Sequence, residues 1–223
     1  MRFVLVRHGQ TDWNLSKRVQ GQTDLPLNET GIMQAGLLAG SLKKLPIRLI
    51  FSSCLMRAKE TAEILRDEIN RTGKNLPEVI PMEDLAEVAF GEWEGKTLAQ
   101  IAELYPEDYE RWVRDPAWQT PTGGESRESL RGRTARAIDT ICAREDLTED
   151  STVAIVAHGG ILVYVIAYLL RAETERREII VENASITTVD YDRKTGAGHL
   201  VRMNDTDHLD GGMKTPWKPD LRK

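Results

Sequence analysis

Short apolar runs recur along the chain and alternate with longer segments of helical spacing. Each run is bounded by polar or turn residues and is short enough for a buried strand. The pattern predicts strands at residues 2–6, 47–51, 78–82, 152–157, 185–191 and 199–204. The third of these is bracketed by Pro77 and Pro81. It is expected at a sheet edge, where proline is tolerated.

The segments between these runs have apolar residues on one helical face. They predict helices over 28–44, after Ser53, over 97–104, 107–114 and 126–144, and directly after the strand at 152–157. Asn28 is a suitable N-cap for the first helix, because its side chain can accept from free backbone N–H groups. Strands and helices alternate, which predicts an α/β fold. The expected architecture is a three-layer sandwich, with a mostly parallel central sheet and helices on both faces.

Residues 153–170 form the longest apolar stretch, and its length raises the question of a membrane span. A histidine and two adjacent glycines interrupt it near the centre. A buried strand, a turn and a core helix therefore explain the stretch better than a transmembrane helix does.

Composition adds limits on location and partners. The 223 residues suit one sizeable domain, and the net charge of −5 argues against a general nucleic-acid binder. Cys54 and Cys142 are the two cysteines, and the amino terminus lacks the pattern of a secretory signal. We therefore expect a cytoplasmic protein with no membrane partner.

Polar residues follow three of the predicted strands at the point where each strand ends. The triplet RHG occupies residues 7–9, the pair SS at 52–53 leads to Arg57, and HGG occupies 158–160. The carboxyl ends of parallel strands meet at one edge of a sheet, where ligands bind in α/β folds. Two histidines and two arginines are therefore expected to converge there.

Such a group suits a phosphoryl anion. Arginine binds pairs of phosphoryl oxygens in a fixed plane, and a helix beginning at 159–161 would add backbone N–H donors. A neutral histidine has a free ring nitrogen that can attack phosphorus, and nearby arginines favour the neutral form. One histidine after a strand is more often structural. Two at equivalent strand ends favour a site, and the arginines argue against a metal ion.

Six segments together resemble the signature of the histidine phosphatase superfamily, also called the phosphoglycerate-mutase-like family. In chain order they are VRHGQTDWN (6–14), QGQTDLPLNETG (20–31), SSxLxRAxETA (52–62), LxEVxFGEWEG (85–95), GGES (123–126) and AHGG (157–160). The resemblance extends to about residue 205. It implies a single domain over 1–208, with a variable lid at about 88–150. The glycines, prolines and basic residues that follow predict an extended tail at 209–223.

The resemblance also implies roles for particular residues. His8 would be the nucleophile that takes the phosphoryl group. Arg7, Arg57 and His158 would surround the peripheral oxygens of that group. Glu87 would donate a proton to the leaving oxygen and then act as the base for water. No metal or other cofactor is implied.

Four further residues are expected at the substrate, three by the same resemblance and one from the chemistry of glycine. Asn14 would donate a hydrogen bond to the phosphoryl group, while Gln20 and Gly21 would lie near the substrate. Gly159, after the second histidine, would allow backbone and ligand to approach closely.

The acid role of Glu87 needs a source for its proton, because a free glutamate is almost entirely ionised at pH 7. Burial could protonate it, the phosphate of the ligand could supply the proton, or the enzyme could act only at acid pH. The apolar neighbours Val88, Ala89 and Phe90 are consistent with burial. A solvated loop residue is the alternative.

The expected activity is hydrolysis of the phosphomonoester of a small metabolite. The segment between Glu87 and His158 is compact and lacks an adjacent arginine pair, which favours hydrolysis over mutase-type transfer. A catalytically inactive phospho-ligand sensor on the same fold is a third possibility. Residues 203–209 resemble α-ribazole-phosphate and metal-independent phosphoserine phosphatases, although Phe90 stands where the latter carry a histidine. The tail is expected to pack on its own domain or on a second subunit, so a homodimer is allowed.

Overall fold

The fold is described from a computed structural model, which covers residues 1–114, 120–172 and 179–215. A six-stranded sheet lies at its centre in the order β3-β2-β4-β1-β5-β6. The strands are β1 (Arg2–Arg7), β2 (Ile47–Ser53), β3 (Ile80–Met82), β4 (Thr152–Ala157), β5 (Ile186–Asp192) and β6 (Ala197–Asp205). Strands β1 to β4 are parallel to one another, β5 runs antiparallel to β1, and β6 runs antiparallel to β5. The predicted fold is confirmed, with β3 at an edge.

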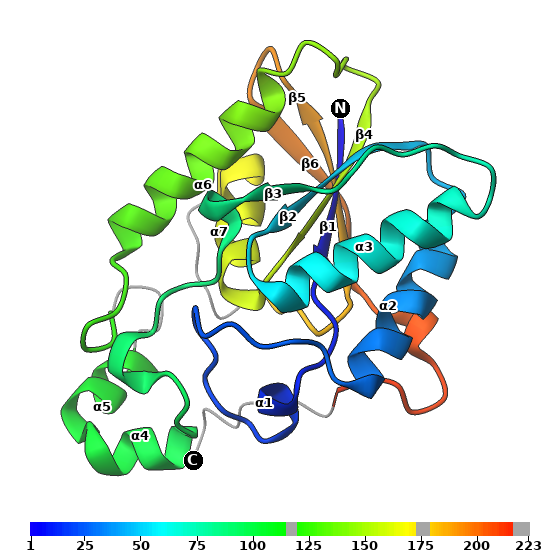
Figure 1. Ribbon diagram of the computed structural model, residues 1–223. Coiled ribbons are helices and arrows are strands. Elements are labelled where there is room, and N and C mark those ends of the chain that lie inside the picture. Colours follow the sequence, from blue (N-terminus) through cyan, green and yellow to red (C-terminus); the bar gives the residue numbers. More distant parts are fainter. Residues whose placement is uncertain (115–119, 173–178, 216–223) are drawn as a thin grey trace.

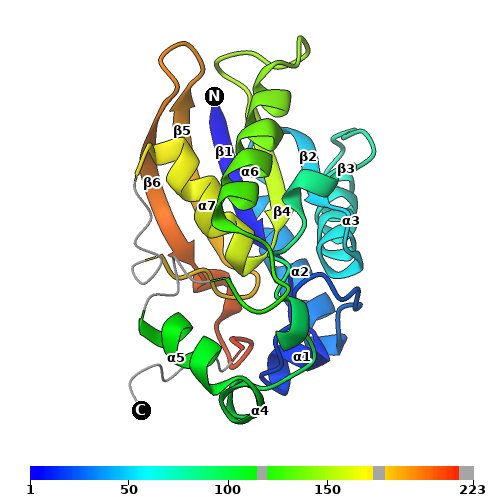
Figure 2. The same ribbon diagram turned by 90° about the vertical axis from the view of Figure 1, so that its left-hand side faces the viewer.

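The helices form the outer layers. They are α1 (Asp12–Leu15), α2 (Glu29–Leu42), α3 (Met56–Asn70), α4 (Leu98–Leu104), α5 (Pro106–Arg114), α6 (Arg127–Cys142) and α7 (Gly159–Leu170). Short 3₁₀ turns occupy Glu83–Leu85, Gly91–Trp93 and Asp207–Leu209. Helices α2 and α3 cover one face of the sheet and α6 and α7 the other, while α4 and α5 lie beyond the carboxyl end of β1 (Figures 1 and 2).

The side chains of the central strands alternate between the two faces of the sheet, so the hydrophobic core consists of two clusters, one on each face. Val4 and Val6 of β1 pack on the side of α2 and α3, whereas Phe3 and Leu5 pack on the side of α6 and α7. Successive side chains of a strand point to opposite faces, so a continuous apolar run is what a sheet covered on both sides requires. The sandwich holds the strand ends in fixed positions.

The apolar stretch at 153–170 divides as expected. Its first part is β4, and its second part is α7, which begins at Gly159. Eight of the twelve α7 residues are buried, so the helix is apolar because it is covered by the protein. Within the described ranges, no helix is long and apolar enough to cross a membrane. The cytoplasmic location stays a prediction.

The start of the predicted tail returns to α2. The side-chain amide of Gln34 donates to the Met213 carbonyl at 2.6 Å and to the Thr215 hydroxyl at 3.2 Å. Gln10 donates to the same hydroxyl at 3.0 Å. Residues 213–215 therefore pack on their own domain, while 216–223 lie outside the described residues.

Candidate active site

The two histidines are brought together by the register of two neighbouring strands. In the parallel pair of β1 and β4, Arg7 lies opposite Ala157. His8 and His158 are the next residues on each chain, and their ring centroids are 5.0 Å apart. Both side chains are almost fully buried, with exposed fractions of 2% and 0%. The predicted convergence of the histidines is confirmed.

His8 is held with one ring nitrogen free to react. Its Nδ1 lies 2.6 Å from the Gly9 carbonyl oxygen, which can only accept, so Nδ1 carries the proton. Nε2 then bears the lone pair. Burial, followed by the positive charges of Arg57 and Arg7, holds the pKa of His8 well below its usual 6.5. The imidazole is therefore neutral at physiological pH and nucleophilic at Nε2.

His158 is oriented by a hydroxyl at the end of the next strand. Its Nε2 lies 2.7 Å from the Ser53 Oγ, which can donate to it. Nδ1 is buried and has no partner among the described residues. If Ser53 donates, Nδ1 carries a proton and is a donor for a ligand beside His8. Burial and the charge of Arg57 also hold the pKa of His158 well below 6.5, so this ring is neutral too.

Two arginines complete the positive part of the site. Arg7 donates to the Val181 carbonyl at 2.7 Å, and Arg57 donates to the carbonyls of Thr23 and Gly21, both at 2.8 Å. Burial lowers the pKa of Arg7 to about 10 and also lowers that of Arg57, but both stay charged at pH 7. Carbonyl oxygens fix the guanidiniums without neutralising them, so their charge remains available to an anion.

Glu87 lies at the amino end of α7 and interacts with both arginines through its charge. Its carboxylate accepts from the backbone N–H groups of Val88, Gly160 and Ile161 at 2.9, 3.1 and 2.9 Å. The N–H groups expected to face the phosphoryl group are therefore occupied by this side chain at Gly160 and Ile161.

A buried ion pair that the sequence did not reveal fixes the backbone of the segment that carries Glu87. Arg133 of α6 donates to the carbonyls of Asp84, Ala86 and Glu87 at 2.8, 2.6 and 3.1 Å. Glu125 balances its charge, with an N–O distance of 2.8 Å. Glu125 belongs to the GGES segment, so that motif supports the segment carrying Glu87 from a distance.

The four residues predicted at the substrate lie in the segments that follow His8 and His158 along the chain. Asn14 Oδ1 accepts from the Thr11 backbone at 3.0 Å, and within the described ranges Nδ2 has no acceptor and can serve a ligand. Gln20 accepts from the Thr11 hydroxyl at 2.9 Å. Gly21 has φ +53°, and its carbonyl binds Arg57. A Cβ on Gly159 would lie 3.4 Å from the Arg7 guanidinium.

Two residues that were not predicted from the sequence, Asn183 and Glu94, hold these segments in place through hydrogen bonds. The side-chain amide of Asn183 donates to the His8 carbonyl at 3.1 Å and to Asn14 Oδ1 at 3.1 Å. The carboxylate of Glu94 accepts from Gln22 N, Phe90 N, Thr23 N and Thr23 Oγ at 2.9–3.1 Å. Glu94 stands in the FGEWEG segment, which was the available signal. Nothing in the local sequence marked Asn183.

A fourth histidine and two arginines of α5 make structural contacts outside this cluster. His208, which follows β6, donates from Nε2 to the Ala184 carbonyl at 2.9 Å. Arg111 and Arg114 form ion pairs with Asp108 and Glu110 on the exposed surface of α5. In the part of the chain described by the structure, no group of three or more His, Cys, Asp or Glu side chains is placed to hold a metal ion.

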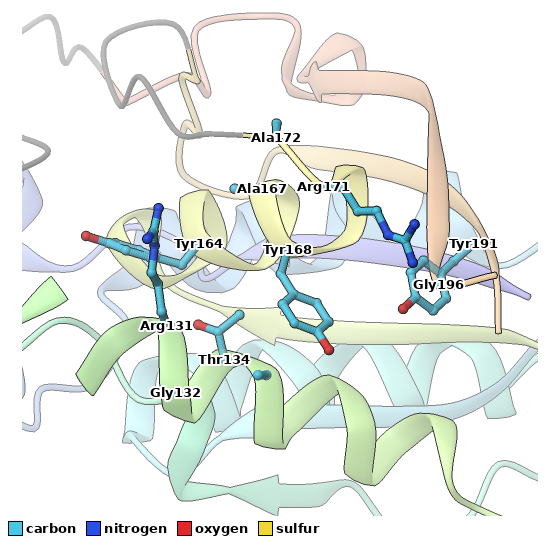
Figure 3. Close-up of a pocket in the computed structure, with 11 residues that line it drawn as sticks. Arg131, Gly132, Thr134, Tyr164, Ala167, Tyr168, Arg171, Ala172, Tyr191 and Gly196 are labelled. Atoms are coloured by element: carbon cyan, nitrogen blue, oxygen red, sulfur yellow. The ribbon is translucent and has the colours of Figure 1, made fainter. Parts of the chain in front are cut away.

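A separate groove of about 640 Å³ lies between α6 and α7 (Figure 3). Its lining includes Tyr164 and Tyr168 of α7 and Tyr191 of β5. The backbone of Tyr191 bonds to that of Met1, so the groove extends toward the amino end of β1, opposite the end that carries His8. It does not belong to the cluster of histidines and arginines.

Comparison with known proteins places this chain in one family. The model of the histidine phosphatase superfamily (branch 1) matches residues 3–206. Phosphoserine phosphatase 1 of Hydrogenobacter thermophilus is 31% identical over 210 residues, covering 94% of each chain. Glucosyl-3-phosphoglycerate phosphatase of Mycobacterium tuberculosis is 39% identical over 176 residues, 76% of this chain and 75% of that one. The crystal structure of the α-ribazole phosphatase of Shigella flexneri superposes with a TM-score of 0.79 at 28% identity, covering 92% of this chain and 96% of that one.

Proposed function

Because this chain belongs to the histidine phosphatase superfamily, we propose that it hydrolyses the phosphomonoester of a small metabolite through a phosphohistidine at His8. One observation carries the proposal. A neutral buried imidazole presents its Nε2 lone pair beside two charged guanidiniums and a second imidazole. The named relatives, which act on phosphoserine, glucosyl-3-phosphoglycerate and α-ribazole phosphate, are consistent with this substrate class.

In the first step, His8 Nε2 attacks phosphorus and the bond from phosphorus to the ester oxygen breaks. Arg7, Arg57 and His158 donate to the three peripheral oxygens, so the charge that moves onto them is stabilised by groups already in place. Glu87 gives a proton to the departing alkoxide. In the second step Glu87 takes a proton from water, which attacks phosphorus and releases phosphate and free His8.

The three N–H bonds to Glu87 bear on its proton source. All three are donors, so both oxygens of the carboxylate act as acceptors. A substrate that arrives as the phosphate monoanion carries one proton. We propose that this proton passes to Glu87 and from there to the leaving oxygen, which allows turnover near neutral pH.

We also propose that the reaction needs no metal ion. Two fixed positive charges, those of Arg57 and Arg7, act on the reacting imidazole. They repel a cation and perform the charge stabilisation that a metal would otherwise supply. The presence of Arg7, Arg57, His8, His158 and Glu87 in one cluster favours an enzyme over an inactive sensor.

Hydrolysis of p-nitrophenyl phosphate in EDTA tests the proposal. We expect activity that the chelator does not change, that His8→Ala abolishes, and that accompanies an alkali-stable phosphorylated His8 detected by mass spectrometry after rapid quenching. Chelator-sensitive activity would reject the metal-free mechanism. Full activity in His8→Ala would reject the nucleophile. A panel of phosphoserine, 3-phosphoglycerate, fructose bisphosphate and α-ribazole phosphate then ranks the substrates by kcat/KM.

The acid role is tested separately with Glu87→Gln. The p-nitrophenolate ion leaves without help, whereas an alkoxide needs a proton. The variant should therefore lose more turnover on an alkyl phosphate than on p-nitrophenyl phosphate. Equal losses on the two substrates would dismiss the acid assignment.

A further inference from the structure

Helix α2 has one face in the core and one bare apolar face. Its Leu38 and Ala39 are fully buried in the cluster shared with α3 and the sheet. On the opposite side, Ile32, Met33 and Leu37 have exposed fractions of 52%, 47% and 41%. The helix lies at the periphery of the molecule (Figure 1), and about half of the surface of each of these three residues is exposed. Together with Gly36 and Gly40 they form what we call the α2 face.

Within the described fold, no close contact requires glycine at the two glycine positions of the α2 face. A Cβ at Gly36 or Gly40 would meet nothing within 4 Å. Gly31 in the same helix is different, because a Cβ there would lie 2.1 Å from the Gln10 carbonyl oxygen. Glycine inside a helix is destabilising relative to alanine. A second helix that packs closely against this face would account for Gly36 and Gly40, since the distance between helix axes depends on side-chain size at the contact.

The charges at the two ends of α2 indicate which helix that would be. Glu29 is exposed at the amino end, and Lys43 and Lys44 are exposed at the carboxyl end. None of them forms an ion pair within the ranges that the structure describes. A twofold axis between Gly36 and Leu37 would place Glu29 opposite Lys44 of a second antiparallel copy. Charge and helix-dipole signs are then favourable at both ends.

The same axis matches large residues with small ones. Met33 of one copy falls opposite Gly40 of the other, and Leu37 falls opposite Gly36. A twofold interface requires a surface that is complementary to itself, and this helix meets that requirement in both charge and size. We propose that this protein forms a homodimer in which the α2 faces of two copies pack antiparallel to each other.

Sedimentation velocity of the full chain, from about 1 to about 100 µM, tests the dimer, and this measurement does not depend on any catalytic activity. Leu37→Glu should weaken association at least tenfold, because it places two like charges near the axis. Leu104→Glu is the matched control, since Leu104 is 59% exposed on α4. It should associate like the wild type.

Charge reversal tests the orientation. Glu29→Lys should weaken the dimer, and the double variant Glu29→Lys with Lys44→Glu should restore it. Gly40→Ala should raise the melting temperature of the dilute monomer while weakening association, because alanine favours the helix but obstructs close approach. A merely solvent-exposed glycine would give only the first effect.

Several outcomes would overturn the proposal. A full chain that stays monomeric at about 100 µM removes it. Equal association of the Leu37→Glu and Leu104→Glu variants would place the dimer contact elsewhere. A chain ending at Thr215 that dimerises when the full chain does not would assign the α2 face to residues 216–223.

Discussion

Replacement of Glu94 by glutamine should separate the loop that holds Arg57 from the rest of the site. The Glu94 carboxylate binds the backbone of Gln22, Thr23 and Phe90, thereby joining the segment after Gln20 to the segment after Glu87. The carbonyls of Gly21 and Thr23 in turn hold the Arg57 guanidinium. Glu94 therefore acts on Arg57 through two carbonyl oxygens.

The expected loss of stability depends on which of the N–H and O–H groups that bond to Glu94 keep an acceptor in the glutamine variant. A glutamine amide has one oxygen, which can replace only one carboxylate oxygen and keep the bonds from Gln22 and Phe90. Its NH₂ group then faces the Thr23 N–H, so two donors meet and the N–H loses its acceptor. The Thr23 hydroxyl can rotate and accept from the NH₂ group instead. Hydrogen bonds to charged groups contribute about 1.5–3 kcal/mol each, and an unsatisfied N–H adds a penalty. We expect a loss of about 2–4 kcal/mol in the free energy of unfolding.

Denaturant unfolding and steady-state kinetics measure the two consequences. Because a small displacement of a positioning group can reduce turnover a hundredfold, kcat should fall by about 10- to 100-fold, with a smaller change in KM. Glu92→Gln is the matched control: this exposed carboxylate stands two residues earlier and lies 3.5 Å from the Tyr105 hydroxyl. It should change stability by less than about 0.5 kcal/mol. If the Glu94 and Glu92 variants behaved alike, the positioning argument would be refuted.

Three further predictions concern the histidines and the end of α7. Ser53→Ala removes the partner of His158 Nε2 and should lower kcat about tenfold with KM within about twofold; unchanged kcat would show that the hydroxyl does not orient the ring. His8 and His158 have lowered pKa values in the folded state, so the unfolded chain binds more protons below about pH 6.5. Stability should therefore be full above pH 6.5 and fall as the pH drops toward 5. His158→Gln should flatten that decline in urea unfolding, and an equally steep curve would contradict the assignment. Gly160→Ala would bring a Cβ within 2.6 Å of the Glu87 carboxylate. It should slow alkyl phosphates more than p-nitrophenyl phosphate, and uniform loss would argue against displacement of Glu87.

The apolar runs predicted much of the fold, because a strand that is buried on both faces of a sheet must be apolar along its whole length. The runs ending at Val6 and Ala157 were placed correctly, and with them the histidines that follow. The reversed direction of β5 could not be predicted in this way, since an apolar run reads the same in either direction. Helix α1 was missed because four residues are too few to show helical periodicity.

The candidate site was predictable where chemistry follows a strand and less so where it depends on distant contacts. Glu87 was identified only through the family resemblance, and its position on the N–H groups of α7 depends on a contact 73 residues away. Asn183 is joined to His8 across 175 residues. Contacts of this kind have no periodic signal, so they appear only once the chain is folded.

The spacing of His8 and His158 has a consequence for how this molecule can change over time. Both residues directly follow paired strands, so the gap between the rings is set by sheet geometry and is independent of any loop length. Surface segments can be lengthened, shortened or exchanged without moving one ring relative to the other. New substrate preferences can therefore arise beside an unaltered phosphoryl centre. The same attachment to the innermost strands means that the two rings separate only when the whole domain unfolds.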